Sequence, residues 1–429
     1  MKSLYPLILL PGLLCAEDRA LTLKQAVERA LRQNPEVMIA RLDEQKAQLG
    51  VRIARDPFLP KVFAGSGDAY TYGYPNSIDG AAPSIIQIRT DMALFNRSKS
   101  FGLAEARENA RGAGIQAESK TDEIVYRTAV VFLDAEQAAH SLELVQREAE
   151  SLERVRGVIA ARVSEGRQLE LDRRRADVDL ARARQRAKSF AEAKDYAEGS
   201  LSTVLGYGTG DRVTPVSDDD GLSAALEKAA PANEDAAAEA ALGASKDLKS
   251  LASQLAAKIL EVRSERATRL PQVGLIAQYA LFAKSSYQAY FGKFQRNNAQ
   301  LGVDVTFPLL LGSAPSAQAA QAETDTFRIR QQVGMERNRV SLEARHAYQE
   351  MATLTDARSL AKLDLEVQRD QLSLLLAQLD EGRASSQQVD AARVEEQEKW
   401  IAYYAADNQL QHARLSLLHQ TGALLAALR

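Results

Sequence analysis

Apolar residues recur at seven-residue steps along two long stretches of the chain, and both stretches carry the pattern in the same register. The first row of such positions is Ile124, Val131, Ala138, Val145, Leu152 and Ile159. Adding 216 to each number gives a second row that is apolar except at one position: Val340, Ala347, Leu354, Ala361, Gln368 and Leu375. Heptad spacing of this kind is typical of helices that pack side by side. Because the register is shared, the pattern predicts a helical hairpin that occurs twice in the chain.

A glycine turn follows each of these long helices. The sequence SEGR lies at 164–167 and DEGR lies at 380–383, which is the same offset as that of the heptads. Glycine tolerates the positive φ that a tight turn between antiparallel helices requires. The turns therefore predict helical hairpins over about 99–205 and about 313–424. The outgoing helix of the first hairpin, from about 99 to 163, would be roughly 97 Å long at 1.5 Å per residue.

A shorter helix precedes each hairpin and stops at prolines. The periodicity predicts one helix over roughly 23–56, ended by Pro57 and Pro60, and another over roughly 233–269, ended by Pro271. With a length of about 50 Å, the first could stack end to end with the return helix of its hairpin. One long helix would then lie beside two shorter ones in each half.

Between the short helix and the hairpin of each half, apolar and polar residues alternate. The alternation predicts four strands, at about 61–73, 85–95, 273–283 and 298–308. The apolar positions, expected to face lipid, are Ile86, Ile88, Met92, Leu94, Leu301, Val303, Val305 and Phe307. The polar positions, expected to face a lumen, are Gln87, Arg89, Asp91, Asp304 and Thr306. Alternation over about ten residues is typical of a membrane β-strand, although a small soluble hairpin packed on a core gives the same pattern.

Four strands in a bilayer cannot stand alone. Unpaired backbone groups at the sheet edges would cost several kcal/mol each in hydrocarbon, and four strands are too few to enclose a water-filled lumen. We therefore expect the chain to associate through its strands. Two copies would give eight strands and an interior filled by side chains, whereas three would give twelve strands and room for a pore, which favours a homotrimer.

The N-terminus indicates export. Lys2 is followed by an apolar stretch and by the small residue Ala16, which predicts a secretory signal over 1–16. Cys15 is the only cysteine of the 429 residues. We favour its removal with the signal over lipidation, because a small residue usually precedes a lipidated cysteine and Leu14 stands there. No later apolar run reaches the roughly 18 residues of a membrane-spanning helix.

Composition and the polar residues argue against other classes. A formal net charge of −3 provides no basic field for nucleic acid. None of the four histidines has a partner at the i,i+4 spacing of a metal site, and GYGTG at 206–210 follows a helix, so we interpret it as a helix terminus. The sequence predicts no catalytic site, no metal and no cofactor, and hence a protein that is not an enzyme.

Several of these segments resemble the TolC-like outer-membrane efflux proteins, or outer membrane factors. The resemblance rests on LTLKQAVERALRQNPEV at 21–37, on LPKV and LPQV after the short helices, on the strand ends ALFNRS and FPLLLGS, and on the repeated glycine turn. It implies a mainly α protein with a small membrane β part. Three chains would form a twelve-stranded barrel in the outer membrane, in contact with its lipid, and a helical barrel in the periplasm. The domains would be a first repeat at 17–206, a connector at 207–232 and a second repeat at 233–429.

The resemblance also implies a function and its sites. Proteins of this family are passive exit ducts of tripartite efflux or type I secretion systems, which dock on a periplasmic adaptor and an inner-membrane pump. Their tip motif is Gly, then Ser or Thr at +3, Asp or Glu at +6, Val at +7 and Ala at +10. The candidate docking residues that match it, or match the preceding Arg, are Arg162, Gly166, Asp172, Gly382, Ser385 and Val389. The first turn departs from the motif at Leu169 and Arg173, and the second at Gln388. Acidic rings near the tip restrict the closed pore in this family, which makes Asp380, Glu381 and Asp390 candidate gate residues.

Two other classes compete with the duct. A coiled-coil protein that spans the periplasm and tethers the envelope without conducting would share the helices. A periplasmic adaptor would show one hairpin flanked by β-rich domains instead of two hairpins with strands between them. We therefore expect a duct, with the tether as the alternative.

Overall fold

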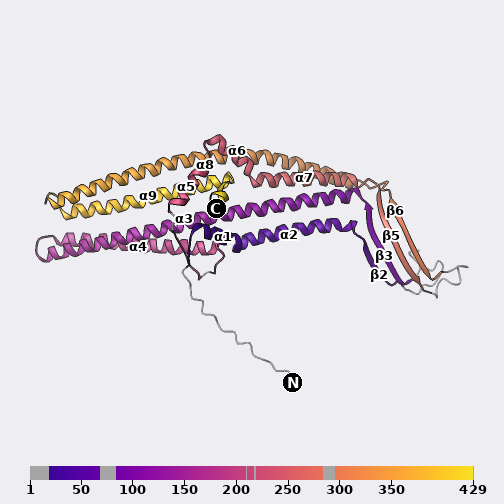
Figure 1. The fold of residues 1–429 in the computed structure, drawn as a ribbon, viewed down its shortest axis with the longest axis horizontal. Coiled ribbons are helices and arrows are strands. Elements are labelled where there is room, and N and C mark those ends of the chain that lie inside the picture. Colours follow the sequence, from indigo (N-terminus) through magenta and orange to yellow (C-terminus); the bar gives the residue numbers. More distant parts are fainter. Residues whose placement is uncertain (1–18, 68–83, 209, 217–218, 284–294, 429) are drawn as a thin grey trace, which may run out of the picture. The chain divides into compact units, whose positions relative to one another are not determined.

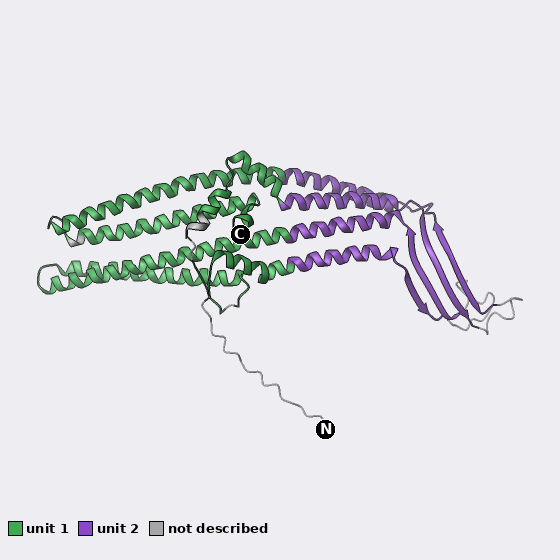
Figure 2. Ribbon diagram, viewed as in Figure 1, with its two compact units in different colours: residues 1–39, 118–245, 337–429 green, residues 40–117, 246–336 purple. Residues whose placement is uncertain are grey.

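The computed structural model describes residues 19–67, 84–208, 210–216, 219–283 and 295–428. The predicted signal at 1–16, Cys15 and the distal part of the first predicted strand lie outside these residues. The chain forms two compact units, each of which contains segments from both predicted repeats (Figure 2). Unit 1 comprises residues 1–39, 118–245 and 337–429, and unit 2 comprises residues 40–117 and 246–336.

Unit 2 carries the sheet. Its four strands are β2 (Lys61–Gly65), β3 (Ser84–Phe95), β5 (Gln272–Phe282) and β6 (Asn297–Thr306). They pair in the order β2-β3-β5-β6, and every pair is antiparallel (Figure 1). The strands predicted from alternation are therefore present, and β2 and β6 form the two edges of the sheet.

Helices continue from the sheet within unit 2. They are α2 (Pro35–Arg55), which ends through the short helix η1 (Asp56–Phe58) before β2, α7 (Lys246–Ala267), and the first parts of α3 (Arg97–Ser164) and α8 (Ala314–Asp380). The prolines at 57 and 60 stop α2 as predicted, because each lacks the N–H that a helix interior needs. Among the described residues, no helix has the length and apolarity needed to cross a bilayer.

Unit 1 contains both glycine turns. There α3 turns into α4 (Glu170–Val204) and α8 turns into α9 (Ser386–Gln420), which confirms the two predicted hairpins. The remaining elements of the unit are β1 (Arg19–Leu21), α1 (Leu23–Gln33), β4 (Val213–Pro215), α5 (Asp219–Ala229), α6 (Glu234–Ala244) and α10 (Leu424–Ala427).

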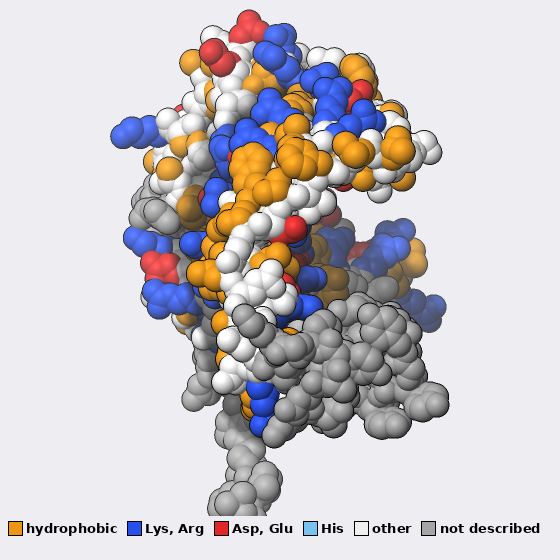
Figure 3. Space-filling view, turned by 90° about the vertical axis from the view of Figure 1, so that its right-hand side faces the viewer, with side chains coloured by type: hydrophobic (Ala, Val, Ile, Leu, Met, Phe, Trp, Pro, Cys, Tyr) orange, Lys and Arg blue, Asp and Glu red, His pale blue; other side chains and the backbone are white. Residues whose placement is uncertain are grey.

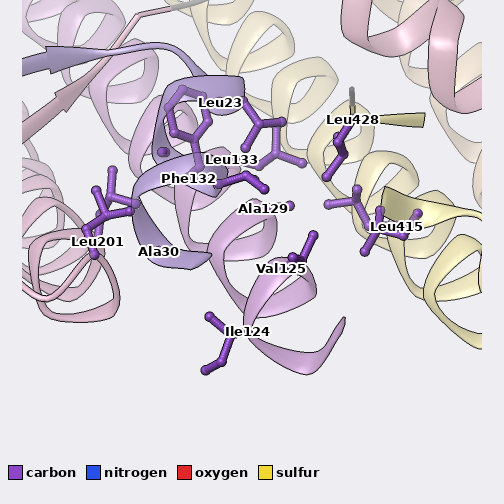
Figure 4. Close-up of a cluster of buried hydrophobic side chains, with 14 of the residues drawn as sticks. Leu23, Ala30, Ile124, Val125, Ala129, Phe132, Leu133, Leu201, Leu415 and Leu428 are labelled. Carbon is purple, nitrogen blue, oxygen red and sulfur yellow. The ribbon is translucent and has the colours of Figure 1, made fainter. Parts of the chain in front are cut away.

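The main core of unit 1 joins these elements (Figure 4). Ile124, Phe132, Leu201 and Leu415 are fully or almost fully buried, although they come from α3, α4 and α9. Burial of a side chain of this size contributes about 1.5–3 kcal/mol. The heptad position Ile124 thus packs in the core, as its spacing indicates.

The short helix predicted before each hairpin is in fact two helices. Asn34 separates α1 from α2, with an extended backbone and a side chain that accepts a hydrogen bond from the Glu36 N–H at 2.8 Å. Pro35 follows, and a proline disfavours the helical conformation of the residue before it. In the second half Ser245 separates α6 from α7.

The return helix meets the first break, as the predicted end-to-end stack requires. The Asn34 side-chain amide donates to the carbonyl of Val204, the last residue of α4, at 2.7 Å. Gly206 then reverses the chain with a φ of +74°. GYGTG therefore begins at a helix terminus, as the sequence indicates.

The predicted connector at 207–232 contains a strand and a helix that the sequence patterns do not predict. Strand β4 pairs in parallel with β1, which brings Arg19 beside Val213, and α5 follows it. This pairing joins segments that lie far apart in the sequence, and neither strand is long enough to show an alternating pattern.

Candidate functional site

The first tip is a helix end closed by two backbone hydrogen bonds. The Gly166 N–H donates to the Val163 carbonyl at 3.0 Å, and the Arg167 N–H donates to the Arg162 carbonyl at 2.9 Å. This is the Schellman arrangement, in which the reversing residue adopts a left-handed conformation. Gly166 has a φ of +69°, and a Cβ at this position would meet no atom within 4 Å.

The second tip has the same backbone. The Gly382 N–H donates to the Leu379 carbonyl at 3.0 Å, and the Arg383 N–H donates to the Gln378 carbonyl at 2.7 Å. Gly382 has a φ of +72° and the same open surroundings. Arg162 and Gln378 therefore occupy one structural position, because each is the third-last residue of its helix.

The two tips differ in how the return helix begins. Ser385 is the N-cap of α9, and its hydroxyl accepts from the Gln388 N–H at 3.3 Å while the Gln388 side chain accepts from the Ser385 N–H at 2.9 Å. This capping box satisfies two otherwise unpaired N–H groups. The N-cap of α4 is Leu169, which provides no side-chain hydrogen bond. The +3 and +6 positions of the tip motif are thus the N-cap and the third helical residue, and Gln388 performs the second role without a charge.

The structure separates the predicted docking residues by exposure. Val389 is only 2% exposed, so in this structure it does not form part of the surface of the tip. Leu169, by contrast, is 69% exposed, and Leu171 beside it is also exposed. These two leucines are therefore surface residues of the first tip, although Leu169 departs from the tip motif.

The acidic residues predicted as a gate lie around the second tip. Arg383 forms an ion pair with Glu381 at 3.2 Å. Asp390 is partly buried on the first turns of α9, where burial raises the pKa of its carboxyl and Arg393, 3.7 Å away, opposes the shift. Asp380 is the last residue of α8. Whether these groups restrict a pore stays a prediction.

The sheet in unit 2 sorts its side chains into two faces. Directly paired residues of antiparallel strands share a face, so the register aligns Ile88 with Tyr279 and Ala299, and Met92 with Leu275 and Val303. The same face carries Ile86, Leu301 and Val305, and exposed hydrophobic side chains lie on the side of the molecule that bears the strands (Figure 3). Leu94 lies at a bulge, and Phe307 follows the last residue of β6.

Polar side chains occupy the other face. The register aligns Gln87 with Asn298 through β5, Arg89 with Gln278 and Gln300, and Gln272 with Thr306. Near one end of the sheet lies a cavity of about 330 Å³, whose lining of polar and apolar residues includes the charged Lys61, Asp91, Lys99 and Asp304. The predicted lumen-facing residues thus share one face, and the assignment of that face to a lumen stays a prediction.

Histidines gather between α3 and α9 in unit 1, which the sequence does not indicate. His140 stacks on Tyr404 with 5.5 Å between ring centroids, and His412 Nε2 lies 3.1 Å from an Asp134 oxygen. His419 stacks on Tyr126. Across the described parts of the chain, no group of three or more His, Cys, Asp or Glu residues could hold a metal ion.

Long helical hairpins that continue into an amphipathic sheet, twice in one chain, are the architecture expected from the resemblance to the TolC-like proteins. The family comparison agrees: residues 26–207 match the family described as outer membrane efflux protein. The match confirms the resemblance inferred from the sequence. No curated protein sequence matches the chain significantly.

Solved structures share the fold along nearly the whole chain. A membrane protein from Pseudomonas aeruginosa is 18% identical with a TM-score of 0.75, over 93% of this chain and 92% of its own. The Campylobacter jejuni CmeC outer membrane channel is 14% identical with a TM-score of 0.74, over 94% of this chain and 86% of its own. The Neisseria gonorrhoeae MtrE outer membrane channel, in its open state, is 16% identical with a TM-score of 0.71, over 94% of this chain and 89% of its own. At these identities the likeness establishes the fold.

Proposed function

We propose that this chain is the subunit of an outer-membrane channel, the passive exit duct of a tripartite efflux or type I secretion system. The observation that carries the proposal is the sheet, with one apolar face, one polar face and two unpaired edges. An apolar face suits lipid and a polar face suits a wet lumen. The family match at 26–207 supports the same function, and so does the fold shared with proteins described as outer membrane channels.

The open edges support a trimer. Strands β2 and β6 have one unpaired side each in the single chain, and hydrocarbon offers no partner for such groups. If β6 of one copy pairs with β2 of the next, three copies close a twelve-stranded barrel. The location that follows is the outer membrane of a Gram-negative bacterium, with the hairpins in the periplasm.

Membrane fractionation and conductance test this function. The protein should require detergent for release from the outer membrane and should migrate as a trimer. In planar bilayers the purified trimer should produce discrete conductance steps, because the proposed lumen is wet. A trimer that never conducts would instead support the periplasm-spanning tether and would contradict the duct.

We place the docking surface for a periplasmic adaptor at the two tips, around Gly166 and Gly382. The support is their position at the ends of the hairpins and the partial match to the tip motif. Valine at either glycine would be strained, since a β-branched residue avoids positive φ. Gly166→Val and Gly382→Val should therefore abolish export while trimers persist in the outer membrane. Gly157→Val, an open helical glycine near the first tip, is the control, and unchanged export in both tip variants would contradict the assignment.

The gate assignment has its own test. Replacement of Asp380, Glu381 and Asp390 by Asn or Gln should reduce cation selectivity and change the single-channel conductance, because three copies would remove nine carboxylates from one ring. The same exchange at Glu165 and Glu170 on the first tip is the matched control. Unchanged conductance and selectivity in the triple variant would exclude these residues as a gate.

A further inference from the structure

An ion pair joins α7 to α8 near the sheet in the second repeat but has no equivalent in the first. Arg266, in the last turn of α7, pairs with Glu323 of α8. The offset of 211 that relates the prolines after α2 and α7 makes Arg55 the counterpart of Arg266. The offset of 216 that relates the heptads of α3 and α8 makes Arg107 the counterpart of Glu323. A pair of opposite charges in the second repeat is therefore a pair of like charges in the first.

Contacts within the first repeat also place these two arginines on facing sides of α2 and α3. The Glu44 carboxylate lies 3.8 Å from where a Cβ on Gly114 would be, so these residues mark where the two helices meet. Arg55 follows Glu44 by about three helical turns and shares its face. Arg107 precedes Gly114 by about two turns and likewise shares its face. Since α2 runs towards the sheet and α3 runs away from it, both arginines lie on the sheet side of the contact.

The arginines of this cluster lack a counter-charge. Arg52, Arg55 and Arg107 are exposed, and none of them forms an ion pair with another described residue. Arg52 lies three residues before Arg55 and is its neighbour on the surface of α2. Asp56, the carboxylate next to Arg55 in the sequence, pairs with Lys61 instead. Like charges at this spacing repel, so an anion held between them would stabilise the cluster.

The cluster lies on the side of α2 that points away from the cavity at the end of the sheet. Pro57 lines this cavity together with Lys61 and Asp91, which are paired residues of the polar face. Helix geometry places Arg52 and Arg55 at least about 120° around the axis from Pro57. The arginines are therefore on the side of the apolar face, for which we propose contact with lipid.

The level of the cluster suits the headgroup layer of a bilayer. Arg107 lies about 15 Å along α3 from its first residue, which follows β3 after a single residue. Side chains lean towards the N-terminus of their helix, so Arg107 leans towards the sheet and a long side chain covers part of this distance. Headgroups extend roughly 5–8 Å beyond the hydrocarbon on each side of a bilayer. The helix dipole favours cations at the end of α2 but does not account for Arg107, which is near the start of α3.

We propose that Arg52, Arg55 and Arg107 bind the phosphate of an anionic phospholipid in the periplasmic leaflet. This site rests on the proposed function, because it requires the sheet to lie in the outer membrane. Guanidinium groups form paired hydrogen bonds with phosphate oxygens, and several of them around one phosphate also remove their mutual repulsion. In the second repeat Glu323 takes the place of the phosphate. Each chain therefore has one such site, which ties the depth of the sheet to the lipid headgroups.

Native mass spectrometry of the full-length trimer tests the site by counting bound phospholipid. The protein in detergent is titrated with phosphatidylglycerol or with phosphatidylcholine, whose headgroup has no net charge. The parent should bind one phosphatidylglycerol per chain, in preference to phosphatidylcholine. Arg107→Glu gives the first repeat the ion pair of the second, so it should fold as the parent does. It should weaken phosphatidylglycerol binding about 30-fold, because it changes the charge by two units at roughly fivefold per charge.

The reciprocal variant adds a site. Glu323→Arg should give the second repeat a copy of the cluster, since Arg263 and Arg266 correspond to Arg52 and Arg55, and should raise the count to two phosphatidylglycerol molecules per chain. The control is Arg154→Glu, the same change of charge on α3 at an exposed residue near the first tip, which should leave the count unchanged.

Three results would overturn the site. They are equal binding of the two lipids, unchanged phosphatidylglycerol binding in Arg107→Glu, and displacement of phosphatidylglycerol by millimolar inorganic phosphate, which would indicate a site for free anions. Any of these in a trimer that conducts would leave the channel standing without the lipid site. Selective lipid binding by a trimer that never conducts would instead contradict the channel and leave the lipid site standing.

Discussion

Two glycines with the same backbone conformation should differ strongly in their tolerance of a methyl group. Gly206 and Gly166 have φ values of +74° and +69°. A Cβ at Gly206 would lie 2.6 Å from the carbonyl oxygen of Gln33 and 3.1 Å from its carbon, whereas a Cβ at Gly166 has no neighbour within 4 Å. Alanine at Gly166 therefore adds backbone strain alone, and alanine at Gly206 adds a collision with backbone.

These distances set the expected free energies. An L-residue in the left-handed region costs about 1–2 kcal/mol, which is the whole effect at Gly166. At Gly206 the backbone of the α1 end must shift, and overpacking of this kind costs about 1–3 kcal/mol more, so the total is roughly 2–5 kcal/mol. The second repeat offers an independent pair: a Cβ at Gly422 would lie 2.7 Å from the Ala244 Cβ, while Gly382 is open.

Native-state hydrogen exchange on the purified protein measures this difference locally. Amides at the end of α4 should exchange about 30-fold to several thousand-fold faster in Gly206→Ala, and amides near the first tip about 5- to 30-fold faster in Gly166→Ala. Gly157→Ala, in a helix and in open space, should not accelerate exchange, because alanine favours helix. If Gly206→Ala and Gly166→Ala accelerated exchange equally, the close approach of Gln33 would not add to the cost of a Cβ at Gly206, and the reasoning would be wrong.

Four further substitutions should change stability in defined directions. Gln368 is 5% exposed, and its side-chain N–H group finds no partner among the described residues. Gln368→Leu should therefore stabilise α8 by about 1–3 kcal/mol. Slower amide hydrogen exchange in α8 would support this prediction, and faster exchange would contradict it. Burial raises the pKa of the Glu148 carboxyl above its ordinary 4.5, although Arg186 opposes the shift. The protonated carboxyl therefore stabilises the fold below about pH 4.5, and the free energy of unfolding falls as the pH rises through the folded-state pKa. Glu148→Gln should therefore gain stability over the parent as the pH rises from about 4 to about 7, and a constant difference in thermal unfolding would refute this. Leu169→Ser should add an N-cap and stabilise the start of α4 by about 0.5–2 kcal/mol, and Ser385→Ala should destabilise the start of α9 by as much. Amide hydrogen exchange should therefore become slower at the start of α4 in the first variant and faster at the start of α9 in the second, and the reverse changes would contradict the assignment.

Local patterns in the sequence predict most of the helices, strands and turns. Seven-residue spacing around Ile124 follows from helix geometry, and alternation around Ile88 follows from the pleat of a strand. Gly166 and Gly382 could be found because a tight helix reversal needs positive φ. Each of these signals lies within a few residues of the feature that it predicts.

The features that the sequence does not reveal depend on contacts between distant segments. The pairing of β1 with β4 joins Arg19 to Val213, and neither short strand has a periodic signal. Pro35 marks the break between α1 and α2 in the sequence. No proline follows Ser245, so the break between α6 and α7 can be expected only because Ser245 is the counterpart of Asn34 in the second repeat. Val389 is buried by tertiary packing, although the tip motif by itself would place it on the docking surface.

The duplication fixes the backbone of the two hairpins but not their surfaces. Around Gly166, the segment 144–188 has twelve Lys and Arg against eight Asp and Glu, whereas the equally long segment 360–404 around Gly382 has five against nine. The first tip adds exposed Leu169, and the second adds a capping box at Ser385. Three copies in a ring would therefore present six tips with one backbone geometry and two alternating chemistries. A partner that contacts all six would need two kinds of complementary surface, because opposite net charges on neighbouring hairpins cannot both be matched by one.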